Sequence, residues 1–541
     1  MHMRNTRTYT IKIRLTAFII TLFSLLSING CSHSNRTPSE SAQPSASPLS
    51  TQEPQPTHGG TLRLPMPENV LTENNKLNPL LVRTEETYQL YSLLFDPLIA
   101  VDNTNMLAPS LARSWKADNS GWLISLRNDV KWHDGSAFTA DDVIRTFEAI
   151  KALDKDCYYS DTTVNITEIL KVDELSIHVK TRHPGLMSLY SLNFPIVKFN
   201  ADGSVFGTGA YRLKSASSEQ VVLEVNNEWW DKTPYFDTVE FLSRGSNDLA
   251  LASYEAGLLD FVPSSLLTVG QYASAGETIV ADCMTQQMET LLINHNNEFL
   301  KDSRFRSAIA MLIDRTTIIN NTYMGKARSC DVPFPPDSWL YDASCVAFDY
   351  DVEGAKQLLS DIGFNTDSDE RLCWDYRPIK LRLLCSSTPE NTIRSDASKL
   401  IASNLDAVGI EVEIIEVTNE QTEEGNSFIT KLEEGEWDLA AVGFNLAQSN
   451  ELSGYLYSDG QNNYGHYRDI EMENLVGALR NMSSEQPMRD TAYELQSYFV
   501  EELPFIVLYF RLDSVIYNAE IQGIGTLREP WLVYGQQNWH F

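Results

Sequence analysis

The chain has 541 residues, with 42 Lys and Arg against 73 Asp and Glu, which gives a formal net charge of −31 at pH 7. Such acidity argues against nucleic acid as a partner, because the two surfaces would repel each other. A folded part of about 480 residues exceeds what a single hydrophobic core usually organises, so we expect two or three lobes.

The N-terminus, residues 1–30, is typical of a secretory signal peptide. It carries basic but no acidic residues, and its apolar stretch from Leu15 to Leu26 is too short to predict a membrane span. The segment 28–31, Ile-Asn-Gly-Cys, resembles a bacterial lipobox, which implies lipidation of Cys31. The alternative is an ordinary signal peptide followed by an incidental cysteine. Residues 32–58 are rich in Ser, Pro, Thr and Gln, so they predict a flexible tether.

The chain contains 7 cysteines, and setting Cys31 aside leaves an even number that can pair in an exported protein. Cys330 and Cys345 flank the proline-rich segment 333–336, and we expect a disulfide between them. The alternative is that most of these cysteines are reduced and buried as apolar residues. No pair has the CxxC spacing of a zinc or redox site.

The first half of the chain predicts a regular order of elements. A strand is expected at 61–64, a short helix at 88–94 and another strand at 122–126, where apolar and less apolar positions alternate. Thr139 and Asp142 have the spacing of a capping box at the start of the next helix. The carboxylate of Asp142 therefore has a structural explanation, and we do not expect it to be catalytic.

The later segments predict further strands and helices by their periodicity and their end signals. Strands are expected at 221–225, 380–385, 411–416 and 503–510, and helices at 305–315, 351–362 and 394–408. The two strands around the last of these helices predict a β-α-β unit.

Several of these segments, taken in chain order, resemble the family 5 extracellular solute-binding proteins, which are receptors of peptide and nickel ABC importers. The matching segments are 122–143, the Gly-Thr-Gly turn at 207–213 with 227–235, the strand and helix at 292–315, and the strand at 437–444. The resemblance extends from Gly59 to about Tyr517. It implies an α/β protein of the type II periplasmic-binding-protein-like fold, with two hinged lobes and an inserted extra domain.

The resemblance also implies a division of the chain into parts. The expected parts are the signal peptide (1–30), the lipidated Cys and tether (31–58), lobe I (59–98, 206–287 and 500–541), the inserted domain (99–205) and the opposing lobe (288–499).

The ligand-binding residues are expected between the lobes, at positions that match the family. They are Thr84, Glu85, Glu86, Phe444, Asn445, Ala447, Glu451, Asn463 and Tyr464. In peptide-binding relatives an aspartate after a Gly-Trp strand receives the α-amino group of the ligand. Here Ala447 stands at that position and Phe444 replaces the tryptophan, so Glu451 or Glu85 would have to take over, or the ligand has no free amine there.

The expected function is that of a carrier without cofactor, metal or catalytic residue. The resemblance implies capture of short peptides by hinge closure and delivery to an ABC permease, by a monomer that is held at the extracytoplasmic face of the membrane through its lipid anchor alone. The alternatives are nickel or haem chelates, for which His295 and His466 would be tested, oligosaccharides, a ligand sensor without transport, and a hydrolase. No GxSxG or HExxH segment supports catalysis.

Overall fold

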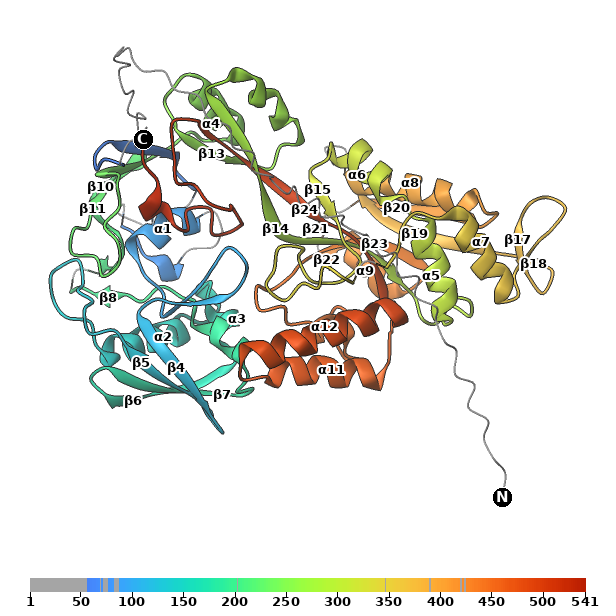
Figure 1. The fold of residues 1–541 in the computed structure, drawn as a ribbon, viewed down its shortest axis with the longest axis horizontal. Coiled ribbons are helices and arrows are strands. Elements are labelled where there is room, and N and C mark those ends of the chain that lie inside the picture. Colours follow the sequence, from blue (N-terminus) through green and yellow to red (C-terminus); the bar gives the residue numbers. More distant parts are fainter. Residues whose placement is uncertain are drawn as a thin grey trace, which may run out of the picture. The chain divides into compact units, whose positions relative to one another are not determined.

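The computed structural model describes residues 56–541 except 69, 72–75, 82–86, 202, 346, 389–390, 419–420 and 423–424 (Figure 1). The expected signal peptide, Cys31, the tether up to residue 55, and the candidates Thr84, Glu85 and Glu86 lie outside the described residues. Among the described residues, no helix combines the length and the apolar character that crossing a bilayer requires.

The N-terminal sheet is 4-stranded, in the order β1 (Thr61–Pro65), β12 (Thr238–Leu242), β11 (Gln220–Val225) and β10 (Tyr211–Ala216). β1 is parallel to β12, whereas the other neighbours are antiparallel. Leu62 and Leu64 are fully buried on one face of β1, as the alternation of apolar residues predicts. The short helix α1 (Tyr88–Leu94) contacts β10.

Asp96, just after α1, joins three segments that are distant in sequence. Its Oδ2 accepts hydrogen bonds from the hydroxyl of Thr208 (2.8 Å) and from the indole N–H groups of Trp229 (3.3 Å) and Trp230 (2.8 Å). Burial raises the pKa of Asp96 above its ordinary value, although the three hydrogen bonds oppose this rise. The turn at 207–209 and the Trp-Trp segment are thereby fixed to the end of α1.

The region between residues 99 and 205 has a 4-stranded antiparallel sheet of its own, in the order β4 (Ala112–Asp118), β5 (Gly121–Leu126), β7 (Ser176–Thr181) and β6 (Ile166–Asp173). The helix α2 (Ala140–Leu153) contacts β6 and begins with the predicted capping box of Thr139 and Asp142. The region also contains α3 (Ser160–Thr163), the 3-10 helix η5 (Leu186–Leu192) and the short pairs β2–β3 (Ile99–Val101, Leu107–Pro109) and β8–β9 (Lys198–Phe199, Val205–Phe206).

The largest sheet is 7-stranded and is built around two long neighbouring strands, β14 (Thr278–Ile293) and β24 (Phe505–Asn518) (Figure 1). The main path of this sheet is β13 (Phe261–Ser264), β24, β14, β23 (Leu439–Asn445), β19 (Lys380–Ser387) and β20 (Glu411–Thr418), and β15 (Ala327–Ser329) pairs with β24 off this path. β13 pairs with the C-terminal part of β24, and β23 pairs with the C-terminal part of β14. The two long strands therefore connect opposite ends of the sheet.

The C-terminal half carries most of the helices, together with the small three-stranded sheet β16–β18 (Asn365–Thr366, Leu372–Trp374, Arg377–Pro378) and the pair β21–β22 (Gln421–Thr422, Gly425–Asn426). The helices are α5 (Ser303–Leu312), α6 (Arg315–Tyr323), α7 (Val352–Asp361), α8 (Ile393–Asp406), α9 (Ser427–Glu434), α10 (Ser453–Leu456), α11 (Ile470–Asn481) and α12 (Glu485–Glu502), while α4 (Asn247–Glu255) precedes β13.

The predicted β-α-β unit is confirmed, because β19 and β20 are parallel and α8 connects them. The helix expected at 305–315 is two helices instead. α5 ends at Leu312, and the carboxylate of Asp314 then accepts a hydrogen bond from Thr317 N (2.9 Å) as the N-cap of α6. The strand expected at 503–510 begins two residues later, at Phe505, and continues to Asn518.

Buried apolar side chains form a separate core in the C-terminal half, which includes Leu291, Phe305, Ile401 and Leu439. A larger core joins the N-terminal sheet, the region 99–205 and parts of α11 and α12. The α/β class is confirmed by this arrangement of helices and sheets. The boundaries of the expected lobes stay predictions.

The expected disulfide between Cys330 and Cys345 is not formed, since both residues are free thiols. Cys330 is buried, and its thiol is directed at the carbonyl oxygen of Val332 (3.2 Å). Burial raises the pKa of this thiol to about 12. The alternative of reduced, buried cysteines describes Cys330 correctly.

Candidate ligand-binding site

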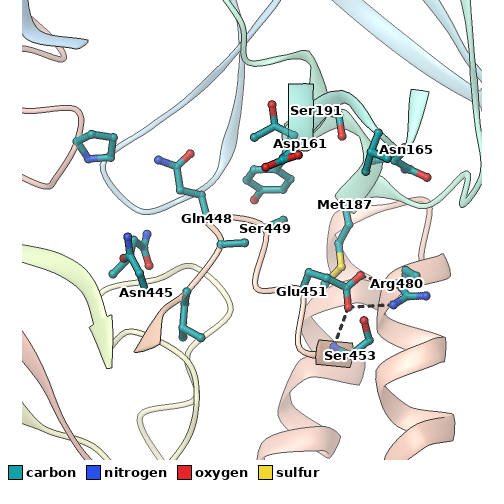
Figure 2. Close-up of a pocket in the computed structure, with 18 of the residues that line it drawn as sticks. Asp161, Asn165, Met187, Ser191, Asn445, Gln448, Ser449, Glu451, Ser453 and Arg480 are labelled. Carbon is teal, nitrogen blue, oxygen red and sulfur yellow. Dashed lines mark hydrogen bonds and ion pairs between the residues drawn. The ribbon is translucent and has the colours of Figure 1, made fainter. Parts of the chain in front are cut away.

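A cavity of about 600 Å³ lies between the region 99–205 and the loop that follows β23 (Figure 2). Residues from 158 to 191 line one side of it, and residues from 445 to 453 line the other. The long strand β14 contributes residues 285–287, and Glu529 and Pro530 complete the lining near the C-terminus. Its volume is in the range of pockets that hold small ligands.

The part of β14 that lines the cavity is a bulge. Met284 pairs with Leu512 and Met288 with Phe510, so residues 285–287 lie opposite Arg511 alone. The hydroxyl of Thr285 donates to the carbonyl of Arg511 (2.8 Å) and accepts a hydrogen bond from Gln287 N (3.1 Å). A bulge of this kind interrupts the ladder and redirects side chains, which brings the carboxamide of Gln286 to the wall of the cavity.

The carboxamide of Gln286 is buried without a partner. The side chain is 8% exposed, and neither Nε2 nor Oε1 has a hydrogen bond to any part of the chain that the structure describes. The backbone carbonyl of Gln286 accepts a hydrogen bond from Leu446 N (2.9 Å), which fixes the loop after β23 to the bulge. An unpaired buried amide costs free energy, and Gln286 lines the cavity, so its carboxamide is a candidate group for binding a ligand there.

The loop after β23 contains three of the predicted ligand residues. Asn445, Ala447 and Glu451 all line the cavity, and Gln448, Ser449 and Ser453 of the same segment line it as well (Figure 2). Phe444 does not line it, because its ring packs edge-on against Tyr455 with a centroid distance of 5.0 Å. The structure thus brings the predicted loop to the cavity but directs Phe444 into the packing beneath it.

Glu451 is held by Arg480, a residue of α11 (Figure 2). Nε of Arg480 donates to Oε2 of Glu451 (2.8 Å) and NH2 donates to Oε1 (3.2 Å), while Ser453 N also donates to Oε1 (2.9 Å). Burial raises the pKa of Glu451, but the hydrogen bonds from Arg480 and Ser453 and the positive charge of Arg480 together outweigh this effect, so the pKa lies below its ordinary value. The charge of Glu451 is therefore already compensated within the protein.

The opposite wall was not predicted from the sequence. It comes from α3, the residues that follow it and η5, and Figure 2 shows Asp161, Asn165, Met187 and Ser191 on this side. The indole of Trp122 donates to the hydroxyl of Ser188 (2.9 Å), which anchors η5 on the neighbouring sheet. No motif marks these residues, whereas the polar Thr285-Gln286-Gln287 between buried methionines was a signal in the sequence.

Asn463 and Tyr464 do not line this cavity. The amide of Asn463 donates to the carbonyls of Tyr457 (2.9 Å) and Tyr467 (2.8 Å) and accepts from Tyr467 N (2.9 Å), so it cross-links its own loop. Tyr464 is half-buried.

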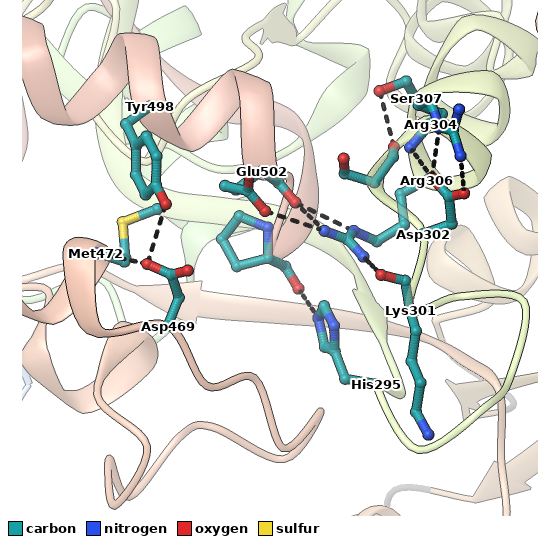
Figure 3. A network of polar contacts seen from close by, with 12 residues as sticks. His295, Lys301, Asp302, Arg304, Arg306, Ser307, Asp469, Met472, Tyr498 and Glu502 are labelled. Atoms are coloured by element: carbon teal, nitrogen blue, oxygen red, sulfur yellow. Dashed lines mark hydrogen bonds and ion pairs between the residues drawn. The ribbon is translucent and has the colours of Figure 1, made fainter. Parts of the chain in front are cut away.

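His295 and His466 meet at a second hollow of about 530 Å³. The ring of His295 is bound through Nε2 to the carbonyl of Pro504 (2.8 Å), and Arg306 is bound to the end of α12 (Figure 3). Burial lowers the pKa of His295 to about 4. Among the described residues, no group of three or more His, Cys, Asp or Glu side chains is placed to hold a metal ion.

The family model of the bacterial extracellular solute-binding proteins, family 5, middle part, matches residues 106–465. The oligopeptide-binding protein AppA of Bacillus subtilis is 23% identical over 486 residues, which covers 83% of this chain and 87% of that protein.

Two solved structures are similar as well. The crystal structure of a nickel ABC transporter protein from Bacillus halodurans has a TM-score of 0.74 and 21% identity, covering 90% of this chain and 98% of that one. The structure of AppA from Bacillus subtilis in complex with a nonapeptide has a TM-score of 0.58 and 20% identity, with 90% of this chain and 100% of that chain covered. The matched segment, the shared fold and the cavity beside β14 agree, and the chain belongs to the bacterial extracellular solute-binding proteins of family 5.

Proposed function

We propose that the protein binds short peptides in the cavity beside β14 and hands them to the permease of an ABC importer. The similarity to AppA, an oligopeptide-binding protein, supports this choice of ligand. Lipidation of Cys31 would hold the protein at the extracytoplasmic face of the membrane, because two or three acyl chains give durable anchoring where one does not.

The observation that carries the proposal is the unpaired carboxamide of Gln286. It offers one N–H donor group and one carbonyl acceptor, and a peptide group presents the complementary carbonyl and N–H. A peptide bound along the bulge would supply both of the partners that the described residues do not. This pairing depends on the ligand backbone and not on its side chains.

The walls of the cavity fit a ligand with variable side chains. Asn445, Gln448 and Ser449 are neutral and polar, and Met187 adds a flexible, polarisable thioether. Water beside the polar side chains of this cavity of about 600 Å³ can bridge groups that do not touch directly. Affinity for the backbone and tolerance of side chains are thereby separated.

β14 and β24 supply the element about which the protein would close. Each is a single continuous strand that joins the two ends of the largest sheet, and the cavity lies at the bulge between them. A ligand that contacts both walls only when they approach each other would shift the protein toward the closed form.

Native mass spectrometry of the protein, purified without denaturation, tests the proposal. The expected result is a series of bound masses that match peptides, which unfolding releases. If the bound mass is instead a single stoichiometric metal, chelate or sugar, the ligand is not a peptide but one of the other ligands that the family suggests. If shortened peptides are released during incubation, the proposed carrier function is wrong and the protein is a hydrolase.

A further inference from the structure

Some charged side chains of the cavity have a partner within the protein, and others have none among the described residues. Glu451 is paired with Arg480, and Glu529 shares a hydrogen bond with the carboxyl group of Asp513. Asp161 also lines the cavity and is exposed, but among the described residues its carboxylate has neither an ion pair nor a hydrogen bond. Asp161 is therefore a negative charge of the cavity that is left for a ligand.

We infer that Asp161 receives the cationic amino group of the ligand, an inference that rests on the proposed peptide-carrier function. Ala447 carries no charge at the position where the ligand's amine was expected, and Glu451 is occupied by Arg480. The receiving carboxylate is thus on the other wall, in the region 99–205.

The position of Asp161 is fixed by its neighbours. The hydroxyls of Thr162 and Thr163 donate to the carbonyl of Tyr159 (2.9 and 3.0 Å), so the turn of α3 that carries Asp161 is held by its own side chains. The backbone that carries the carboxylate therefore loses little freedom when a ligand binds, which favours affinity.

The surroundings of Asp161 also suit a cation. Tyr158 lies three positions earlier and lines the same cavity, and its ring packs edge-on against Tyr88 with a centroid distance of 6.0 Å. Aromatic faces attract ammonium groups, and the attraction between an ammonium and a carboxylate grows as water leaves the site.

A second unpaired charge makes the cavity suited to a zwitterion. Arg182 lines the same wall, is exposed, and its guanidinium has no ion pair in the described part of the chain. A free peptide carries one charge of each sign at its two ends, so opposite unpaired charges on one wall match it without excess charge.

The test uses the variants Asp161→Asn and Asp154→Asn with two synthetic pools of tri- to hexapeptides, one with free amino termini and one N-acetylated. Asp154 is a matched control, because it is exposed on the same segment, lies outside the cavity and loses the same charge. Binding is measured by calorimetry and by native mass spectrometry, and thermal melts verify that each variant is folded.

Wild-type protein and Asp154→Asn are expected to prefer the free-amine pool, and Asp161→Asn is expected to bind that pool about tenfold more weakly and to lose the preference. Equal binding of both pools by the wild type, or an unchanged preference in Asp161→Asn, overturns the inference and leaves the peptide carrier intact. If neither pool binds to any form of the protein, the proposed function fails and the inference fails with it.

Discussion

Glu451 and Arg480 form a two-point ion pair in the wall of the cavity, with 2.8 Å between Oε2 and Nε and 3.2 Å between Oε1 and NH2. Their side chains are 34% and 18% exposed, so the pair is partly shielded from water. Removing one partner should leave the other charge uncompensated in a place where hydration is incomplete.

Glu451→Gln is therefore expected to lower the free energy of unfolding by about 1–2 kcal/mol, because the guanidinium of Arg480 loses its charged partner. Urea denaturation followed by circular dichroism measures this change. Glu501→Gln, at an exposed residue near the end of α12, removes the same charge and should have little effect. Equal stability of the two variants would contradict the prediction.

Gln286→Leu separates binding from stability. The substitution removes an amide that has no partner among the described residues, so the free energy of unfolding should stay the same or rise slightly. Binding of peptides should weaken about tenfold, since the leucine cannot bond to the ligand backbone. Gln220→Leu, at an exposed position of β11, serves as the control in calorimetry with the same peptides. Unaltered affinity in Gln286→Leu would show that the carboxamide does not face the ligand.

Asp96→Ala tests the structural role of the carboxylate after α1. The substitution leaves the hydroxyl of Thr208 and the indoles of Trp229 and Trp230 without their acceptor. A loss of about 2–5 kcal/mol in the free energy of unfolding is expected, because one buried and two partly buried donors become unpaired. Chemical denaturation provides the measurement, with Asp237→Ala at an exposed residue as the comparison. A loss no larger than that of Asp237→Ala would refute this role.

The free energy of unfolding should depend on pH because His133 and His295 are partly buried. Burial lowers the pKa of both His133 and His295 to about 4 in the folded protein, whereas an unfolded histidine has a pKa of about 6.5. As the pH falls from about 6.5 to about 4, the unfolded chain takes up protons that the folded protein does not, so the free energy of unfolding decreases.

The expected decrease is on the order of 2 kcal/mol for each histidine, and urea denaturation at several pH values across this window measures it. His133→Gln should make the slope shallower, because one of the two proton-linked groups is removed. An identical slope in the variant and the wild type would show that burial of His133 does not contribute.

Local signals in the sequence predicted the elements near them. Thr139 and Asp142 predicted the start of α2, because a cap depends on residues only three positions apart, and the helix predicted at 351–362 is α7 with Asp351 as its N-cap. The break between α5 and α6 was missed although Asp314 signals a new start, because the apolar periodicity of the first helix continues to Ile313.

The cavity was predicted only on one side. The loop from Asn445 to Glu451 follows a strand that resembles the family, so its place could be inferred, but the pairing of Glu451 with Arg480 joins residues 29 positions apart. Asp161 has no significance in the sequence alone, and the polar segment around Gln286 does not show there that it faces a cavity. They become part of the site only because the bulge of β14 and the turn of α3 come together in the folded protein.

The pairing of β14 with β24 on both sides of the bulge has a consequence for repeated use of the protein. Antiparallel strands cannot slip by one residue without turning every side chain to the wrong face, so the proposed closure would have to bend or twist this ribbon while its register is kept. In the proposed carrier, each cycle of loading and release would thus start from the same geometry, with no step of partial unfolding.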